Sequence, residues 1–155
     1  MKMVARKLSV ALMVAVLLVG AVGLAAQMKQ ETLYKRLGGY DALAAVTDDF
    51  IGRLAADKQL GKFFVGHSKD SLGHIRQLIV DQLCNATGGP CVYIGRSMKV
   101  AHEGLGITDA DWDAAVKHLI ATLDKFKVPQ KEKDEVLAAV SGMRADIVTP
   151  AMKKQ

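Results

Sequence analysis

Apolar side chains recur every three or four residues along most of this chain, which is the spacing of one face of an α-helix. The pattern covers four long stretches: residues 40–55, 68–87, 108–127 and a final stretch that begins at Pro129. Their apolar positions are Leu43, Val46, Phe50, Leu54, Leu72, Ile75, Ile79, Leu83, Trp112, Val116, Leu119, Ile120, Leu123, Val136, Val140, Met143 and Ile147. No stretch alternates apolar and polar residues as a half-buried strand would. We therefore predict an all-α domain of about five helices, the fifth a short one.

Residues typical of helix ends mark where these helices begin and stop. Thr108 and Asp111 have the spacing of a capping box, in which a hydroxyl and a carboxyl satisfy the first backbone N–H groups. The run Gly-Gly-Pro at 88–90 is typical of a helix C-terminus. Residues 97–103 are expected to form the short helix, which carries His102 and is closed by two glycines.

The first 26 residues have the pattern of a targeting segment rather than of a folded helix. They begin with basic residues and continue as an uncharged apolar run, and cleavage after Ala25 or Ala26 would resemble a signal-peptidase site. The alternative is an uncleaved membrane anchor, because the apolar run is just long enough to span a bilayer. Both interpretations place the globular domain, residues 28–150, in the periplasm or otherwise outside the cytoplasm, with residues 151–155 as a tail.

Composition and charge limit the classes of function. The chain has 155 residues, half of them hydrophobic, which suits one domain with one core. The formal net charge is +5, but three of the 21 Lys and Arg residues lie in the first 26 residues, which leaves 18 against 16 Asp and Glu. Basic residues do not cluster with aromatic ones, so nucleic acid is not an expected partner. No Ser-His-Asp set, phosphate loop or carboxylate metal cluster is present.

The two cysteines, Cys84 and Cys91, bracket the turn Asn-Ala-Thr-Gly-Gly-Pro. In an oxidising compartment they are candidates for a disulfide, which would stabilise the fold by about 2–3 kcal/mol in the chain-entropy model. The alternative is two free thiols. There is no Cys-x-x-Cys-His motif, so covalent attachment of a c-type haem is not indicated.

The strongest candidate for chemistry is His102 in the short helix. A neutral imidazole nitrogen is a good ligand for haem iron, and one such bond is enough when an apolar pocket encloses the macrocycle. A lone histidine is more often a surface or hydrogen-bonded residue, so the interpretation depends on its context.

That context resembles the group I truncated haemoglobins. The matching motifs, in order, are Leu33-Tyr-x-x-Leu37-Gly-Gly, Phe63-Phe64, Gly88-Gly-Pro, Tyr93-x-Gly95 and Met98-x-x-x-His102. The resemblance extends from about Thr32 to Val148. It implies a two-over-two helical sandwich that holds haem b (iron protoporphyrin IX) between the 68–87 helix on the distal side and the His102 helix on the proximal side.

Carried over residue by residue, the resemblance assigns roles around the cofactor. His102 aligns with the proximal iron ligand, and Phe64 aligns with the phenylalanine that packs on the porphyrin face. Tyr34, Tyr93 and Met98 align with family positions near the haem or supporting it. For these last three residues, ordinary core packing is the alternative to contact with the haem.

The distal side departs from the family pattern. Ile51 stands where many members have a tyrosine, and Ile75, Leu78 and Ile79 stand at helix positions where others have Gln or His. The distal pocket is therefore expected to be apolar. A hydrogen bond to a partly charged ligand contributes about 1.5–3 kcal/mol, so its loss should speed oxygen escape tenfold or more. Carbon monoxide and nitric oxide need that bond less.

A few polar residues are further candidates on this side. Gln82 lies one turn past Ile79 and is a candidate to reach the pocket. His74 would become a sixth iron ligand, giving a bis-histidyl haem, if its helix were rotated or locally unwound. Arg76 and Lys99 are candidates to pair with the haem propionates.

Three functions are compatible with these features. The first is a haem protein that binds a diatomic gas: O2, CO or NO. The second is an envelope haem protein for electron transfer or peroxidase-like chemistry, with a redox partner protein, and the question of an enzymatic activity stays open. The third is a haem-free helical interaction domain, which the ordered motifs argue against. A membrane is an expected partner only if the N-terminal segment is uncleaved.

Overall fold

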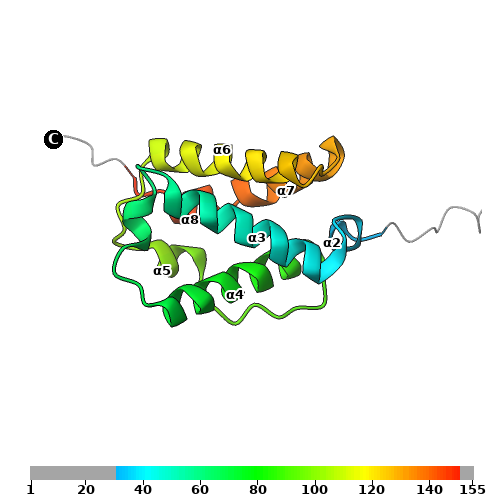
Figure 1. The fold of residues 1–155 in the computed structure, drawn as a ribbon, viewed down its shortest axis with the longest axis horizontal. Helices are drawn as coiled ribbons and strands as arrows, with labels where there is room; N and C mark the ends of the chain where they lie inside the picture. Colours follow the sequence, from blue (N-terminus) through cyan, green and yellow to red (C-terminus); the bar gives the residue numbers. More distant parts are fainter. Residues whose placement is uncertain (1–30, 151–155) are drawn as a thin grey trace, which may run out of the picture. The chain divides into compact units, whose positions relative to one another are not determined.

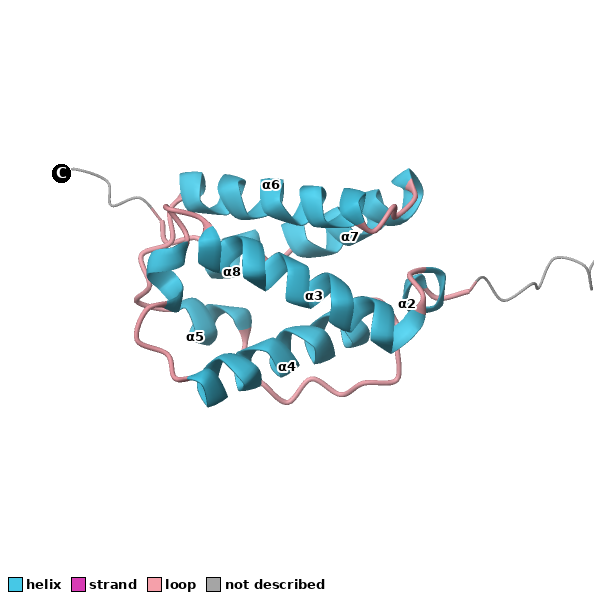
Figure 2. Ribbon diagram, in the orientation of Figure 1, coloured by secondary structure: helices cyan, strands magenta, loops and turns pink. Residues whose placement is uncertain are grey.

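The computed structural model describes residues 31–150, and this part of the chain contains helices and loops but no strand (Figure 2). The expected all-α class is therefore confirmed. The elements are α2 (Leu33–Arg36), α3 (Gly39–Ala56), the 3-10 helix η1 (Gly61–Phe64), α4 (Lys69–Ala86), α5 (Met98–His102), α6 (Asp109–Lys125), α7 (Gln130–Ser141) and α8 (Arg144–Ile147). The expected signal segment, residues 1–26, and the expected tail, residues 151–155, lie outside the described residues.

The long helices form two stacked pairs. Helix α3 packs against both α4 and α6, and α6 packs against α7, so α3 lies between the α6–α7 layer and α4 (Figure 1). The short helix α5 packs against α8, and α2 joins the start of α3 to α7. None of the helices within residues 31–150 is long and apolar enough to span a membrane.

Local capping explains where the helices start. The hydroxyl of Thr108 accepts from the backbone N–H of Asp111, and the Asp111 carboxylate accepts from the backbone N–H of Thr108, so the predicted capping box is confirmed. The hydroxyls of Ser68 and Ser97 cap α4 and α5 in the same way from the N-cap position. Pro129 is the residue before the first turn of α7, as its fixed φ favours.

The prediction of a single last helix was wrong, because the structure divides this stretch into two helices. The apolar positions from Val136 to Ile147 predicted one continuous helix, but the structure ends α7 at Ser141 and starts α8 at Arg144. Glycine weakens a helix by about 1 kcal/mol relative to alanine, and Gly142 stands at this break. The N–H of Met143 donates to the carbonyl of Val140, three residues back, which tightens the chain and ends the α-helical bonding.

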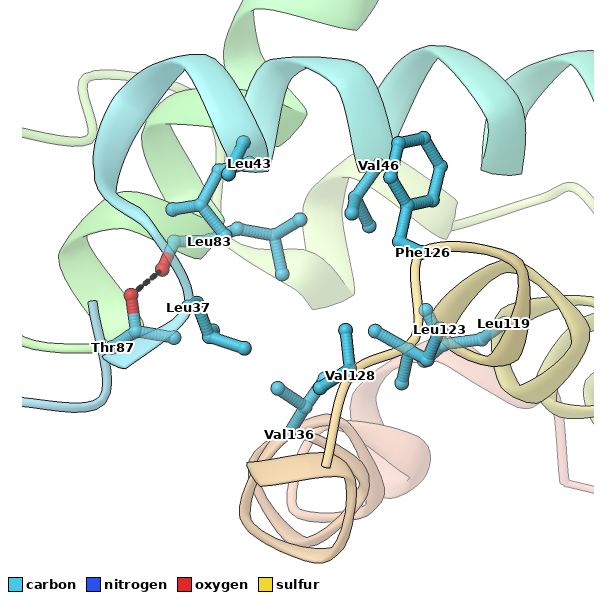
Figure 3. A pocket seen from close by; sticks show the side chains of 11 residues that line it. Leu37, Leu43, Val46, Leu83, Thr87, Leu119, Leu123, Phe126, Val128 and Val136 are labelled. Atoms are coloured by element: carbon cyan, nitrogen blue, oxygen red, sulfur yellow. Dashed lines mark hydrogen bonds between the residues drawn. The ribbon is translucent and has the colours of Figure 1, made fainter. Parts of the chain in front are cut away.

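The core lies where α3, α6 and α7 meet. Its buried side chains are Val46, Leu119, Leu123 and Val136. Beside them is an apolar cavity of about 100 Å³, which the first half of α3, the end of α4 and the α6–α7 corner surround (Figure 3). Arg36 forms ion pairs with Glu132 and Glu135, both at 2.5 Å, which connect α2 to α7.

A disulfide shapes the turn after α4. Cys84 and Cys91 are bonded, with their Cα atoms 5.7 Å apart, and Cys84 is fully buried. Gly88 has φ +79°, which favours glycine, and the N–H of Gly89 donates to the carbonyl of Cys84 at 2.8 Å. The segment that follows runs back along α4 until it reaches α5 (Figure 1). The turn therefore brings the His102 helix to the same side of the fold as α4.

Candidate functional site

His102 is held in a state suited to bind a metal. It is half-buried at the end of α5, and its Nδ1 lies 2.8 Å from the carbonyl oxygen of Met98. Because a carbonyl only accepts, Nδ1 must carry the proton, which leaves the lone pair of the neutral ring on Nε2. Nε2 has no hydrogen-bond partner among residues 31–150. Metal-binding histidines typically donate their other ring N–H to a carbonyl or carboxylate in this way.

The other three histidines have different surroundings. His118 contacts Asp57, with 2.8 Å between Nε2 and Oδ2, and this bond lowers the pKa of the Asp57 carboxyl. His67 and His74 are exposed. Helix α4 is regular through His74, so the structure offers no rotated or unwound segment that would bring this ring to an iron opposite His102.

The apolar residues expected around a cofactor share one property: all are half-buried, and none belongs to the buried core. They are Ile51, Phe64, Ile75, Leu78, Ile79, Tyr93 and Met98. They come from α3, η1, α4, the segment before α5, and α5 itself. None of them lines the cavity of Figure 3. The structure thus keeps these residues apart from the buried core and leaves each of them partly uncovered.

Tyr93 shapes the segment that leads into α5. Its hydroxyl donates to the carbonyl of Arg96 at 2.6 Å, and a Cβ at Gly95 would lie 2.4 Å from that hydroxyl oxygen. Any larger residue at position 95 would therefore require the Tyr93 ring to move, which agrees with the spacing Tyr93-x-Gly95. Tyr34 lies elsewhere, against Gly39 and Gly89 beside the disulfide turn, so its role is to support that turn.

Arg76 and Lys99, the two basic residues expected near propionates, differ in whether the chain already supplies an ion-pair partner. Arg76 forms a two-point ion pair with Asp48, at 2.6 and 2.9 Å, which lowers the pKa of Asp48 and raises that of Arg76. Its guanidinium is therefore already paired with a carboxylate of the chain. Lys99, on α5, is exposed and forms no ion pair within residues 31–150.

Asp111 is a positioning residue that the sequence indicated only as a helix cap. It is 2% exposed and accepts from Thr108, from the Gln59 side-chain amide at 2.8 Å and from Lys62 at 3.4 Å. The bonds from the Thr108 backbone and from Gln59 hold the pKa of this carboxyl far below its usual value. Asp111 therefore joins the segment after His102 to the corner that carries Phe64. No local signal marked Gln59 as its partner.

Gln82 is the polar side chain of α4 that remains incompletely bonded. Its Oε1 is buried and has no hydrogen-bond donor in the described part of the chain, and its Nε2 lies 3.9 Å from the sulfur of Met143. Within residues 31–150 there is no group of three or more His, Cys, Asp or Glu that could hold a metal ion.

The sequence model of the bacterial-like globins matches residues 32–149. The chain belongs to this globin family. Among curated relatives it is similar to the group 1 truncated haemoglobin GlbN of Mycolicibacterium paratuberculosis, 34% identical over 76% of this chain and 85% of the relative. It is also similar to the group 1 truncated haemoglobin of Tetrahymena pyriformis, 30% identical over 77% of this chain and 97% of that protein.

Solved structures of truncated haemoglobins have the same fold as this globin. The truncated haemoglobin of Tetrahymena pyriformis, in its Fe(III) form, matches with a TM-score of 0.71 and 28% identity over 77% of this chain and 100% of that one. The 2/2 haemoglobin of Synechococcus sp. PCC 7002, which carries covalently attached haem, matches with a TM-score of 0.70 and 33% identity over 76% of this chain and 98% of that one. The predicted two-over-two truncated globin is thus confirmed, and its family is a haem-binding one.

Proposed function

We propose that this globin binds haem b through Nε2 of His102 and binds a diatomic gas, O2, CO or NO, on the opposite face. The observation that carries the proposal is the geometry of His102. The Met98 carbonyl fixes the proton on Nδ1, and Nε2 keeps its lone pair in a half-buried setting without a partner among the described residues. Haem held by His102 would supply an iron to which such a gas can bind.

The surrounding side chains suit a flat apolar cofactor. Phe64 and Met98 are half-buried on η1 and α5, and α4 contributes the stripe Ile75, Leu78 and Ile79. Helix α5 packs mainly against α8 rather than against α4, so the apolar face of α4 is not covered by α5 directly. Apolar surface that is covered on binding contributes about 25 cal/mol per Å², and it would keep water from the macrocycle. We propose that Lys99, which is exposed on the same short helix as His102, pairs with a propionate.

The distal residues determine which ligands are held. Ile51, Ile75, Leu78 and Ile79 offer no hydrogen-bond donor, so a polarised ligand such as O2 loses about 1.5–3 kcal/mol relative to a pocket with one. We therefore infer an O2 dissociation rate at least tenfold faster than in a globin with a distal tyrosine, and weaker discrimination against CO.

The test is the visible and resonance Raman spectrum of haem-loaded wild type, His102→Gly and His74→Ala. We expect the iron–histidine band of the ferrous protein to vanish in His102→Gly and an iron–imidazole band to replace it when imidazole is added. His74→Ala should retain the wild-type spectrum in both oxidation states and its shift on CO addition. A His102→Gly spectrum equal to wild type without imidazole would refute the proposal, and a six-coordinate wild type that His74→Ala converts to five-coordinate would favour the electron-transfer alternative.

We also propose that the protein works outside the cytoplasm. The Cys84–Cys91 disulfide supports this, because disulfides persist in oxidising compartments and are rare in the cytosol. Mass spectrometry of the protein recovered from its native host tests it. A mature chain that begins after Ala25 or Ala26 would support export, whereas an intact first segment in the membrane fraction would indicate an anchor. Reduced thiols in the cytosolic fraction would contradict both.

A further inference from the structure

The segment that leads from the disulfide into α5 is attached to the rest of the fold at few points. Within residues 31–150, no backbone N–H or C=O group of residues 92–96 forms a backbone–backbone hydrogen bond. The hydroxyl of Tyr93 donates to the carbonyl of Arg96, so this bond shapes the segment from within and does not tie it to another element. Val92 and Ile94 are 74% and 82% exposed. A segment with so few bonds and so much exposed surface is held mainly at its ends.

The end of α4, where this segment starts, is by contrast firmly fixed. Cys84 is fully buried, and the carbonyl of Thr87 accepts from the backbone N–H of Tyr34 at 2.8 Å. Two attachments hold the segment to this fixed end: the Cys84–Cys91 disulfide, and the hydrogen bond from the Asn85 amide to the Cys91 carbonyl at 3.1 Å. The disulfide is the stronger of the two, because Asn85 is exposed and its amide can bond to water instead.

The disulfide connects the two sides of the proposed haem site. Helix α4 carries the apolar residues that we assign to the distal side, and the segment after Cys91 leads to α5 with His102 (Figure 1). Helix α5 itself packs mainly against α8 rather than against α4. The chain has two cysteines, so the Cys84–Cys91 bond is its one disulfide. It is therefore a covalent restraint that limits how far the segment before His102 can move from α4.

We propose that the Cys84–Cys91 disulfide is a redox switch that sets how tightly the His102 site holds haem. The proposal rests on the proposed function, since it needs haem on His102. The reductant is a dithiol, and one of its thiolates attacks the sulfur of the half-buried Cys91. The Cys84–Cys91 bond breaks, and Cys84 leaves as a thiolate and takes up a proton. The second thiol of the reductant then releases Cys91 as a thiol, so two electrons and two protons pass to the protein and the reductant becomes a disulfide.

Reduction loosens the proximal side because the two ends of the disulfide are held unequally. Two unbonded thiols move apart, and Cys84 has no room to yield because it is fully buried. Cys91 and the weakly held segment after it therefore move outward, and the position of α5 becomes less defined. By thermodynamic linkage, the factor by which reduction weakens haem binding equals the factor by which bound haem disfavours reduction.

The first test uses the apoprotein and does not depend on the cofactor. Hydrogen exchange, followed by mass spectrometry, compares residues 98–102 of α5 with residues 43–54 of α3, in the oxidised protein and after reduction with dithiothreitol. We expect exchange in α5 to become about tenfold faster on reduction and exchange in α3 to stay unchanged. The variant Cys84→Ala/Cys91→Ala should match the reduced wild type without reductant.

A matched control separates this local effect from a general loss of stability. Val136 is 6% exposed in the core on α7 and belongs neither to the segment nor to the haem site. Val136→Ala should lower the stability of the whole fold but leave exchange in α5 at the wild-type rate, because a local opening of α5 does not involve α7.

The second test measures the linkage with haem. Without reductant, the ferric Cys84→Ala/Cys91→Ala variant should transfer haem to excess apomyoglobin about fivefold to tenfold faster than wild type, in the lower part of the usual range of coupling between sites. Half-reduction of the wild-type disulfide should need a ratio of reduced to oxidised dithiothreitol that is higher by a similar factor in the ferrous haem-loaded protein than in the apoprotein.

The outcomes that overturn the proposal are distinct from failure of the proposed function. Exchange in α5 that reduction leaves unchanged, or that rises equally in α3, would overturn the switch, and so would equal half-reduction ratios with and without haem. A reduced protein that unfolds as a whole would overturn it too, since the disulfide would then hold the fold rather than α5. In each of these cases a Soret band that depends on His102 leaves the proposed function intact. A wild type that takes up no haem overturns both proposals.

Discussion

Replacement of Asp111 by alanine should destabilise this globin although the carboxyl touches no cofactor site. Asp111 is 2% exposed at the start of α6 and accepts hydrogen bonds from the Thr108 backbone at 3.0 Å, the Thr108 hydroxyl at 2.7 Å and the Gln59 amide at 2.8 Å. Lys62 adds a charged contact at 3.4 Å. Alanine removes all of these acceptors at once.

The size of the effect follows from the donors left behind. Hydrogen bonds to a charged group contribute about 1.5–3 kcal/mol each, and loss of a helix cap costs about 0.5–2 kcal/mol. The contributions do not add in full, because Thr108, Gln59 and Lys62 are exposed and can bond to water once Asp111 is gone. We therefore expect a loss of about 2–4 kcal/mol in the free energy of unfolding, at the lower end of the summed values.

Urea unfolding followed by circular dichroism measures this change, with Asp113→Ala as the matched control. Asp113 lies two residues further along α6, is exposed, and forms no hydrogen bond or ion pair among residues 31–150. Its replacement should change the free energy of unfolding by less than about 0.5 kcal/mol. Equal stabilities of the two variants would refute the reasoning. In the haem-loaded protein, Asp111→Ala should also lose haem faster, because the corner that carries Phe64 is no longer tied to the segment after His102.

The pH dependence of this contribution has a definite sign. The folded-state pKa of Asp111 is depressed, first by the Thr108 backbone and then by Gln59, below the value of about 3.9 expected for an unfolded chain. The contribution is therefore fully present above the unfolded pKa and is lost as the pH falls through the folded pKa. The stability difference between wild type and Asp111→Asn should be constant from about pH 5 to 8 and should shrink in acid. A difference that grows below about pH 4 would contradict this assignment.

Two further predictions concern the turn after α4. Reduction of the Cys84–Cys91 disulfide should lower the free energy of unfolding by about 2.5 kcal/mol, as urea unfolding with and without reductant will measure, and an unchanged midpoint would contradict it. Gly89→Ala should be strongly destabilising, because its Cβ would lie 2.5 Å from Tyr34 and 2.6 Å from the Cys84 sulfur, whereas Gly73→Ala, which meets nothing within 4 Å, should stabilise α4 by about 0.5–1 kcal/mol in the same assay.

The long helices could be predicted from the sequence because their signals are local. The stretch predicted at residues 68–87 is observed as Lys69–Ala86, and the one predicted at 40–55 is observed as Gly39–Ala56. An apolar repeat of three and four residues is a property of a single helix and does not depend on its neighbours. A cap such as Thr108 likewise bonds only to the first turn of its own helix. The end of the chain was predicted less well, since Gly142 breaks a helix whose apolar repeat continues past it.

The candidate site, too, could be predicted from the sequence only in part. The resemblance to the truncated haemoglobins indicated His102 and the apolar distal positions, but it could not show that the Met98 carbonyl fixes the ring proton and leaves Nε2 free. Nor could it show that Asp48 already holds the Arg76 guanidinium, because the two residues lie 28 positions apart.

By itself, the sequence determined the helical class, the positions of the long helices and the family motifs, because each depends on residues within a few turns of one another. Only the tertiary structure decided which polar groups are satisfied. It paired Asp111 with Gln59, 52 positions away, and left the Gln82 oxygen without a donor among the described residues. Hydrogen bonds and burial between distant segments depend on how the helices pack, and that packing is set by all of the core contacts together rather than by any local pattern.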